Sequence, residues 1–201
     1  MPRTGERGGP QTRAKISQAA TRLFLERGFD AVTVAEVAKE AGVSSVTVFK
    51  HFPRKEDLLL DRQVDAADVL RSAVRDRAPG VDVLESLREA TLRLLDERHG
   101  LSGVADGAIP FFRTVAASPA LIARVREIGA DLQRLLADEL AGDRDFDDDG
   151  PLFAAFFIAG YATVLVRTAS RLIDGGEPDV VAADHRERLE RLFVALRSGV
   201  V

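Results

Sequence analysis

The segment Thr33–Asp57, TVAEVAKEAGVSSVTVFKHFPRKED, constrains the fold of this chain more than any other. Thr33 and Glu36 have the spacing of a capping box, in which two side chains satisfy backbone amides at a helix start. The apolar positions that follow fall on one helical face: Val34, Val37, Ala38 and Ala41. Gly42 stands where a left-handed glycine ends a helix, and Ser44 is suited to cap the next one. Two short helices joined by a glycine turn predict a helix-turn-helix, whose second helix lies in the DNA major groove.

Related signals flank this segment. Upstream, residues 11–30 carry an apolar helical face that stops at Gly28: Ile16, Ala19, Ala20, Leu23 and Phe24. Downstream, the chain continues Phe52-Pro53-Arg54-Lys55-Glu56-Asp57-Leu58. Over roughly residues 11–60, this order of helices, turn and Lys-Glu-Asp-Leu resembles the DNA-binding domain of TetR-family transcriptional regulators.

The resemblance implies an all-α chain of two domains and a bacterial, cytoplasmic homodimer. The expected N-terminal DNA-binding domain, residues 1–54, has a flexible arm over 1–10 and the helix-turn-helix over 33–51. The expected C-terminal effector-binding and dimerisation domain spans residues 55–201. The chain has no cysteine, which excludes disulfides and fits a reducing cytoplasm. Its N-terminus carries no apolar signal-peptide core.

Residues 44–51 are the expected recognition helix. The candidates for contact with base edges or phosphates are Ser44, Ser45, Thr47 and Lys50, because hydroxyl groups and lysine pair with groove atoms. Val46 stands where the family usually has glycine, and it fits a thymine-methyl contact and a buried position equally well. Phe49 replaces the usual tyrosine and so loses a hydroxyl that often contacts phosphate. We expect Val48 and Phe52 to be buried.

A second set of residues is expected to meet the DNA backbone. Helix N-termini favour anions, which suggests phosphate contacts for Thr12, Arg13, Thr33 and Lys55, and His51 at the end of the recognition helix is a further backbone candidate. The charge distribution supports DNA binding by the N-terminal part. Residues 1–55 hold ten Lys/Arg against five Asp/Glu, whereas the remainder of the chain holds 18 against 27. A basic head attracts phosphate, and the acidic body should bind something else. Arg54 replaces the usual serine cap of the following helix.

The rest of the chain reads as helices, over residues 59–77, 82–95, 108–117, 118–135, 151–173 and 178–196. The segment 152–166 is apolar around its whole circumference and therefore needs cover on every side, although it is too short to span a membrane. We expect part of it to meet a second subunit. The residues predicted for that dimer interface are Leu165, Leu189, Leu192, Phe193 and Leu196.

Aromatic residues in the body suggest a pocket for a small hydrophobic or amphipathic effector. The candidates are Phe111, Phe112, Phe153, Phe156, Phe157 and Tyr161, with His99 and Arg113 as polar anchors. Such a stripe is also typical of plain core. The run Asp145-x-Asp147-x-Asp149-Gly150 matches half of a calcium loop, but Phe156 stands where the bidentate glutamate belongs, so we expect a solvated loop.

No constellation of catalytic residues, metal ligands or cofactor motifs is present, so the sequence predicts a regulator and not an enzyme, without a cofactor. Its expected partners are double-stranded DNA with a near-palindromic operator, a small-molecule effector and a second copy of the chain, with no membrane. The predicted function is a repressor released from DNA by its effector. The alternative is a small-molecule-binding protein of the same fold with weak or no DNA binding.

Overall fold

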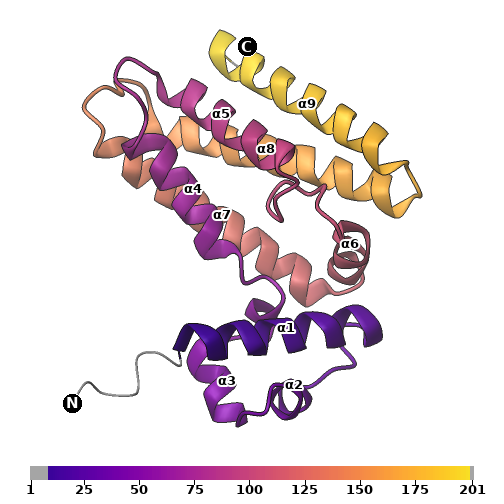
Figure 1. Ribbon diagram of the computed structural model, residues 1–201. Coiled ribbons are helices and arrows are strands. Elements are labelled where there is room, and N and C mark those ends of the chain that lie inside the picture. Colours follow the sequence, from indigo (N-terminus) through magenta and orange to yellow (C-terminus); the bar gives the residue numbers. More distant parts are fainter. Residues whose placement is uncertain (1–8, 200–201) are drawn as a thin grey trace, which may run out of the picture. The chain divides into compact units, whose positions relative to one another are not determined.

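The computed structural model describes residues 9–199, which form nine α-helices and one 3-10 turn and no strand (Figure 1). The elements are α1 Gly9–Arg27, α2 Val34–Glu40, α3 Ser45–His51, η1 Glu56–Leu58, α4 Gln63–Arg75, α5 Val83–Asp96, α6 Ala108–Ala116, α7 Pro119–Ala141, α8 Gly150–Ile173 and α9 Pro178–Ser198. The all-α prediction is confirmed. Of the predicted arm, residues 1–8 lie outside the described range, and Gly9 and Pro10 already belong to α1.

The described residues divide into two compact units. The first comprises the chain up to Asp61 together with Arg113–Val125. The second comprises Arg62–Phe112 and the chain from Arg126 onward.

In the first unit, α1 packs against α2, α3 and η1. Its apolar face, with Ile16, Ala20 and Phe24 fully buried, forms the core that the sequence periodicity predicts. The segment 113–125 joins this unit through polar contacts: Ser118 donates to Asp30 at 3.1 Å, and Arg124 Nε donates to Asp57 at 2.8 Å.

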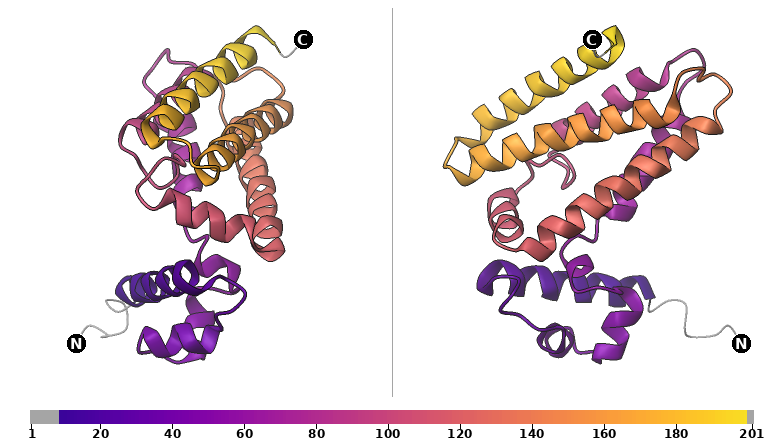
Figure 2. Two further views of the ribbon diagram at one scale, coloured as in Figure 1. Left: turned by 90° about the vertical axis from the view of Figure 1, so that its right-hand side faces the viewer. Right: turned by 180° about the vertical axis from the view of Figure 1, so that it is seen from behind.

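In the second unit, α9 runs back alongside α8, and α5 packs against α9 and α4 (Figures 1 and 2). Gly160 lets α8 and α9 approach closely, since a Cβ at that position would lie 2.3 Å from Leu192 Cδ1. Leu87, Leu136 and Leu189 are among the fully buried residues of the core, so α5, α7 and α9 all contribute to it.

The helix after the first unit begins later than expected. The sequence suggests a helix over 59–77, whereas α4 starts at Gln63 and ends at Arg75. Before it, η1 forms a single 3-10 turn whose start has no side-chain cap. Helix α4 itself has no side-chain cap hydrogen bond at its N-cap residue Arg62, so a missing cap does not account for its later start.

Helix α8 is longer than its apolar run. An 18-residue window of this 24-residue helix has a mean hydropathy of 1.7, which is enough to cross a membrane by length and composition alone. The uninterrupted apolar run 152–166, to which the sequence expectation referred, remains shorter than the 18 residues of that window. Only 22% of that apolar window is buried within the chain, so α8 leaves much apolar surface uncovered.

Candidate nucleic-acid interface and effector region

The start of α2 is fixed by the predicted capping box. The Thr33 amide donates to Glu36 Oε2 at 2.8 Å, and the Glu36 amide donates to Thr33 Oγ1 at 3.2 Å. The hydrogen bond from the Thr33 amide, helped by Arg27, lowers the pKa of Glu36 to about 2. Glu36 therefore stays ionised and keeps the box closed at neutral pH.

The turn between α2 and α3 is a Schellman motif. Gly42 has φ +67°, and its amide donates to the Lys39 carbonyl at 3.2 Å. The Val43 amide donates to the Ala38 carbonyl at 2.9 Å, which completes the paired bonds of this helix end. Ser44 then caps α3 by accepting from the Thr47 amide at 3.1 Å. These three main-chain and cap interactions set the direction in which α3 leaves the turn.

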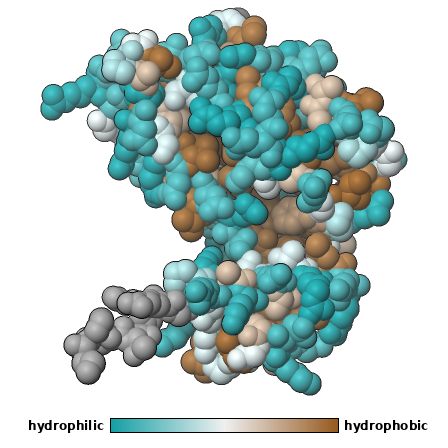
Figure 3. Space-filling view, in the orientation of Figure 1, coloured by the Kyte–Doolittle hydropathy of each residue, from teal (hydrophilic) through white to brown (hydrophobic). Residues whose placement is uncertain are grey.

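Helix α3 has one buried and one exposed face. Val48 and Phe52 are buried, as predicted, and hold the helix on the unit's core. Val46 and Phe49 are 73% and 50% exposed, and Lys50 is exposed on the same side. The buried alternative for Val46 is therefore excluded within this chain. Figure 3 shows hydrophobic residues among hydrophilic ones at the edge of the first unit where α3 lies.

Two predicted phosphate contacts are already used inside the unit. Arg13 donates to the His51 carbonyl, and its guanidinium lies 4.1 Å from the centre of the Phe52 ring. Lys55 donates to the Phe29 carbonyl at 2.7 Å, and its ammonium group lies 4.2 Å from the centre of the Phe29 ring. These cation–π contacts hold α1 to the end of α3 and η1 to the loop before α2. Spacing along the sequence carried no sign of them.

The remaining DNA candidates lie at or near helix starts, except His51, which ends α3. The Thr47 and Ser44 hydroxyls are hydrogen-bonded to each other at 2.9 Å, and the Thr33 hydroxyl donates to Glu36 at 2.8 Å. Thr12, Ser45 and His51 are half-buried.

The predicted effector residues occupy different surroundings. Phe157 is buried and contacts Tyr161 and Phe193, with ring centroids 6.2 and 6.1 Å away. The Tyr161 hydroxyl donates to the Leu101 carbonyl at 3.2 Å, and burial raises its pKa to about 12. Phe156, one residue from Phe157, is 41% exposed on another side of α8. A single lining formed by all six aromatics is therefore wrong, because adjacent helical residues point in different directions.

The other effector candidates form smaller groups. Phe111 and Phe112 lie edge to face at 5.7 Å on α6, where Arg113 is exposed. The Leu101 amide donates to His99 Nδ1 at 3.3 Å, so this imidazole folds back on its own loop. Phe153 instead packs edge to face on Phe146 at 5.4 Å.

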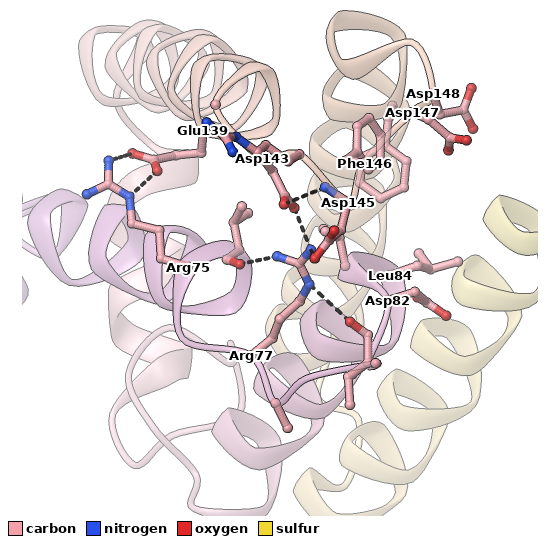
Figure 4. Close-up of a pocket in the computed structure, with 18 of the residues that line it drawn as sticks. Arg75, Arg77, Asp82, Leu84, Glu139, Asp143, Asp145, Phe146, Asp147 and Asp148 are labelled. Atoms are coloured by element: carbon pink, nitrogen blue, oxygen red, sulfur yellow. Dashed lines mark hydrogen bonds and ion pairs between the residues drawn. The ribbon is translucent and has the colours of Figure 1, made fainter.

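Phe153 and Phe146 lie in a hollow that the sequence did not predict (Figure 4). It has a volume of about 1250 Å³ and lies among the α4–α5 turn, the α7–α8 loop and the end of α9. Arg77 donates to the Val74 and Val81 carbonyls and pairs with Asp143 at 2.7 Å. The Arg77 hydrogen bond holds the pKa of Asp143 below its usual value.

The half calcium loop also borders this hollow, and its acids do not converge. Asp149 caps α8 by accepting from the Leu152 amide at 3.0 Å, which commits it to the helix start. In the described part of the chain, no three acidic, histidine or cysteine side chains are grouped so as to hold a metal ion.

The predicted dimer residues face inward. Leu189 and Phe193 are buried in the core of their own subunit, and Leu165, Leu192 and Leu196 are half-buried. Assigning Leu189 and Phe193 to a dimer surface was wrong, because α9 turns that apolar line toward α8 and α5. The exposed apolar residues lie on other faces: Leu152, Phe156, Ala159 and Val166 of α8, and Val180, Ala183 and Val194 of α9.

Residues 16–61 match the family described as bacterial regulatory proteins, tetR family. The chain is also 30% identical over 167 residues to the transcriptional regulator TcmR of Streptomyces glaucescens, a match that covers 80% of this chain and 72% of TcmR. The chain belongs to the TetR family.

Solved structures of TetR-family proteins share the fold over nearly the whole chain. Thermus thermophilus FadR, described as a TetR-family transcriptional repressor in complex with lauroyl-CoA, is 27% identical with a TM-score of 0.60, covering 94% of this chain and 95% of FadR. SmeT, solved as a triclosan complex, is 19% identical with a TM-score of 0.62 and covers 92% of this chain and 91% of SmeT. As a TetR-family member, the chain is a helix-turn-helix transcriptional regulator.

Proposed function

We propose that this TetR-family regulator is a cytoplasmic, homodimeric repressor that leaves its operator when a small hydrophobic or amphipathic effector binds. Residues 1–54 serve as the DNA-binding domain and residues 55–201 as the effector-binding and dimerisation domain. The single observation that carries the proposal is the exposed face of α3, where Val46, Phe49 and Lys50 project from a helix whose entry is fixed by the Gly42 turn.

The DNA contacts follow from that face. Lys50 supplies the charge that pairs with guanine or phosphate, and Val46 supplies an apolar contact for a thymine methyl. Phe49 contacts sugar or methyl groups, because it lacks a hydroxyl for phosphate. Ser44, Ser45 and Thr47 lie at the N-terminus of α3, which favours phosphate oxygens.

A second copy of the chain covers the exposed faces of α8 and α9. Val166 and Val194 are each 66% exposed, which is unusual for valine in a helix that also builds the core. A two-fold contact brings the same stripe of each subunit against its mate and buries both. We favour protein over lipid as the cover, because the same outer side of α8 carries Thr163, Arg167 and Ser170.

The effector class rests on the relatives. FadR was solved with lauroyl-CoA and SmeT with triclosan, both molecules with large apolar parts. In this chain, we assign effector contacts to the half-buried aromatics Phe111, Phe112 and Tyr161, with His99 as a polar partner.

Fluorescence anisotropy with labelled DNA from upstream of the protein's own gene tests the proposal. We expect salt-dependent binding that is at least ~10³-fold tighter than binding to random DNA of equal length. Lauroyl-CoA and triclosan serve as effector probes, and an effector that lowers operator affinity must itself bind less tightly to the operator complex by the same factor. Equal affinity for operator and random DNA would contradict a repressor function.

A further inference from the structure

The walls of the hollow in the second unit are held in place by side chains that are hydrogen-bonded and ion-paired within the protein. Arg77 bonds two carbonyls of the α4–α5 segment and also Asp143 of the α7–α8 loop, so one guanidinium links two walls. Arg75 forms a bidentate pair with Glu139 of α7, one bond of which measures 2.8 Å. Because these donors and acceptors satisfy one another, the walls keep their shape without a ligand, and a ligand need not break them (Figure 4).

Part of the lining is apolar and aromatic. The Phe146 and Phe153 rings pack edge to face at 5.4 Å, and both side chains are only half-buried. Leu84 and Leu196, from α5 and α9, also line the hollow and are half-buried. A concave surface with exposed aromatic area of this kind suits the body of a small organic molecule.

The net charge of the residues that line the hollow determines which sign of charge the bound molecule should carry. Seven carboxylates and four guanidinium groups line the hollow, for a net charge of −3. Arg75 and Arg77 are paired with Glu139 and Asp143, whereas Asp138, Asp147 and Asp148 are exposed and form no ion pair within the described residues. The excess negative charge next to aromatic faces favours a cation, since both carboxylates and ring faces attract positive charge.

We propose that this hollow is a binding site for an organic cation with an apolar body. The apolar part lies on Phe146 and Phe153, and the positive charge lies beside the carboxylates of the α7–α8 loop. The site shares no residue with the effector contacts assigned above, although Phe153 was an effector candidate from the sequence, and the proposal does not depend on DNA binding.

A pair of ions with the same shape and opposite charge tests the proposal. Tetraphenylphosphonium and tetraphenylborate present the same four phenyl rings, so their difference in affinity isolates the charge. Titration calorimetry on the full-length protein without DNA should show tetraphenylphosphonium binding at least about tenfold more tightly. The preference should fall as salt is added, because the carboxylates are exposed.

Variants of the loop locate the site. Asp147→Asn combined with Asp148→Asn removes two rim charges and should weaken tetraphenylphosphonium binding about three- to tenfold. The matched control combines Asp106→Asn with Asp174→Asn, two exposed acids of the same unit that do not line the hollow. The control should leave the affinity within about twofold, and helical circular dichroism should be unchanged in both variants.

Three results would overturn the proposal. The first is no tetraphenylphosphonium binding, and the second is equal affinity for both ions, which would leave only apolar adsorption. The third is binding that survives in the loop variant or falls equally in the control, which would place the cation elsewhere. A failure of operator binding in separate experiments would not bear on any of these outcomes.

Discussion

The His185 imidazole and the Thr168 hydroxyl share a hydrogen bond of 2.8 Å between α9 and α8, where neither side chain reaches solvent. The second ring nitrogen, Nε2, is buried without a hydrogen-bond partner among the described residues. Burial lowers the pKa of His185 to about 4, and the neighbouring Asp184 carboxylate opposes this only in part. The fold therefore holds this histidine neutral.

This burial predicts an acid-dependent loss of stability. The unfolded chain takes up a proton on this histidine below pH 6.5, whereas the folded chain resists until about pH 4. The free energy of unfolding should therefore fall across this window as pH falls, by on the order of 2–3 kcal/mol. Urea unfolding of the wild type and His185→Leu at several pH values measures it. A wild-type slope as shallow as that of the variant would contradict the prediction.

Two glycines in helix interiors should respond oppositely to alanine. Gly129→Ala in α7 meets nothing within 4 Å and should stabilise the protein by about 0.5–1 kcal/mol through helix propensity. Gly160→Ala gains the same helix propensity, but its methyl group would clash with Leu192. This overpacking should lower the free energy of unfolding by about 1–3 kcal/mol. Thermal unfolding of both variants gives the comparison, and similar shifts in Tm would mean that α8 and α9 separate easily.

Lys50→Ala should weaken operator binding by about 1–3 kcal/mol if Lys50 reads a base. Lys39 is an exposed lysine on α2, so Lys39→Ala is a control of equal charge change. Anisotropy titrations with operator and random DNA separate the two roles. An equal loss on both DNAs would make Lys50 a phosphate contact without a part in specificity.

Val166→Glu should convert the dimer into monomers, because it buries a charge at the proposed subunit contact. Val64→Glu is the control, since Val64 is 59% exposed on α4, away from that stripe. Light scattering at micromolar concentration should report a dimer for the wild type and Val64→Glu. A dimeric Val166→Glu protein would place the interface elsewhere.

Local signals were predictable from sequence because their causes are local. The Thr33–Glu36 box, the Gly42 turn and the Ser44 cap each depend on atoms within a few residues, and the structure contains all three. The buried positions Val48 and Phe52 followed from helical period in the same way.

Features that depend on distant parts of the chain were missed. Helical periodicity places Leu189 and Phe193 on one apolar face of a helix. It does not tell whether that face packs inside its own subunit or against another one. The cation–π contacts of Arg13 and Lys55 join residues separated by more than twenty positions. The hollow combines two loops with the end of α9, and only the folded chain brings them together.

The turn at Gly42 sets the direction of α3 independently of the side chains that α3 exposes. The Schellman bonds join main-chain atoms, and the cap uses Ser44, so none of them involves the side chains at positions 46, 49 and 50. Those three positions are free to change through mutation while the helix keeps its direction. Descendants of this protein can therefore come to recognise new operator sequences through single substitutions, without a change of fold.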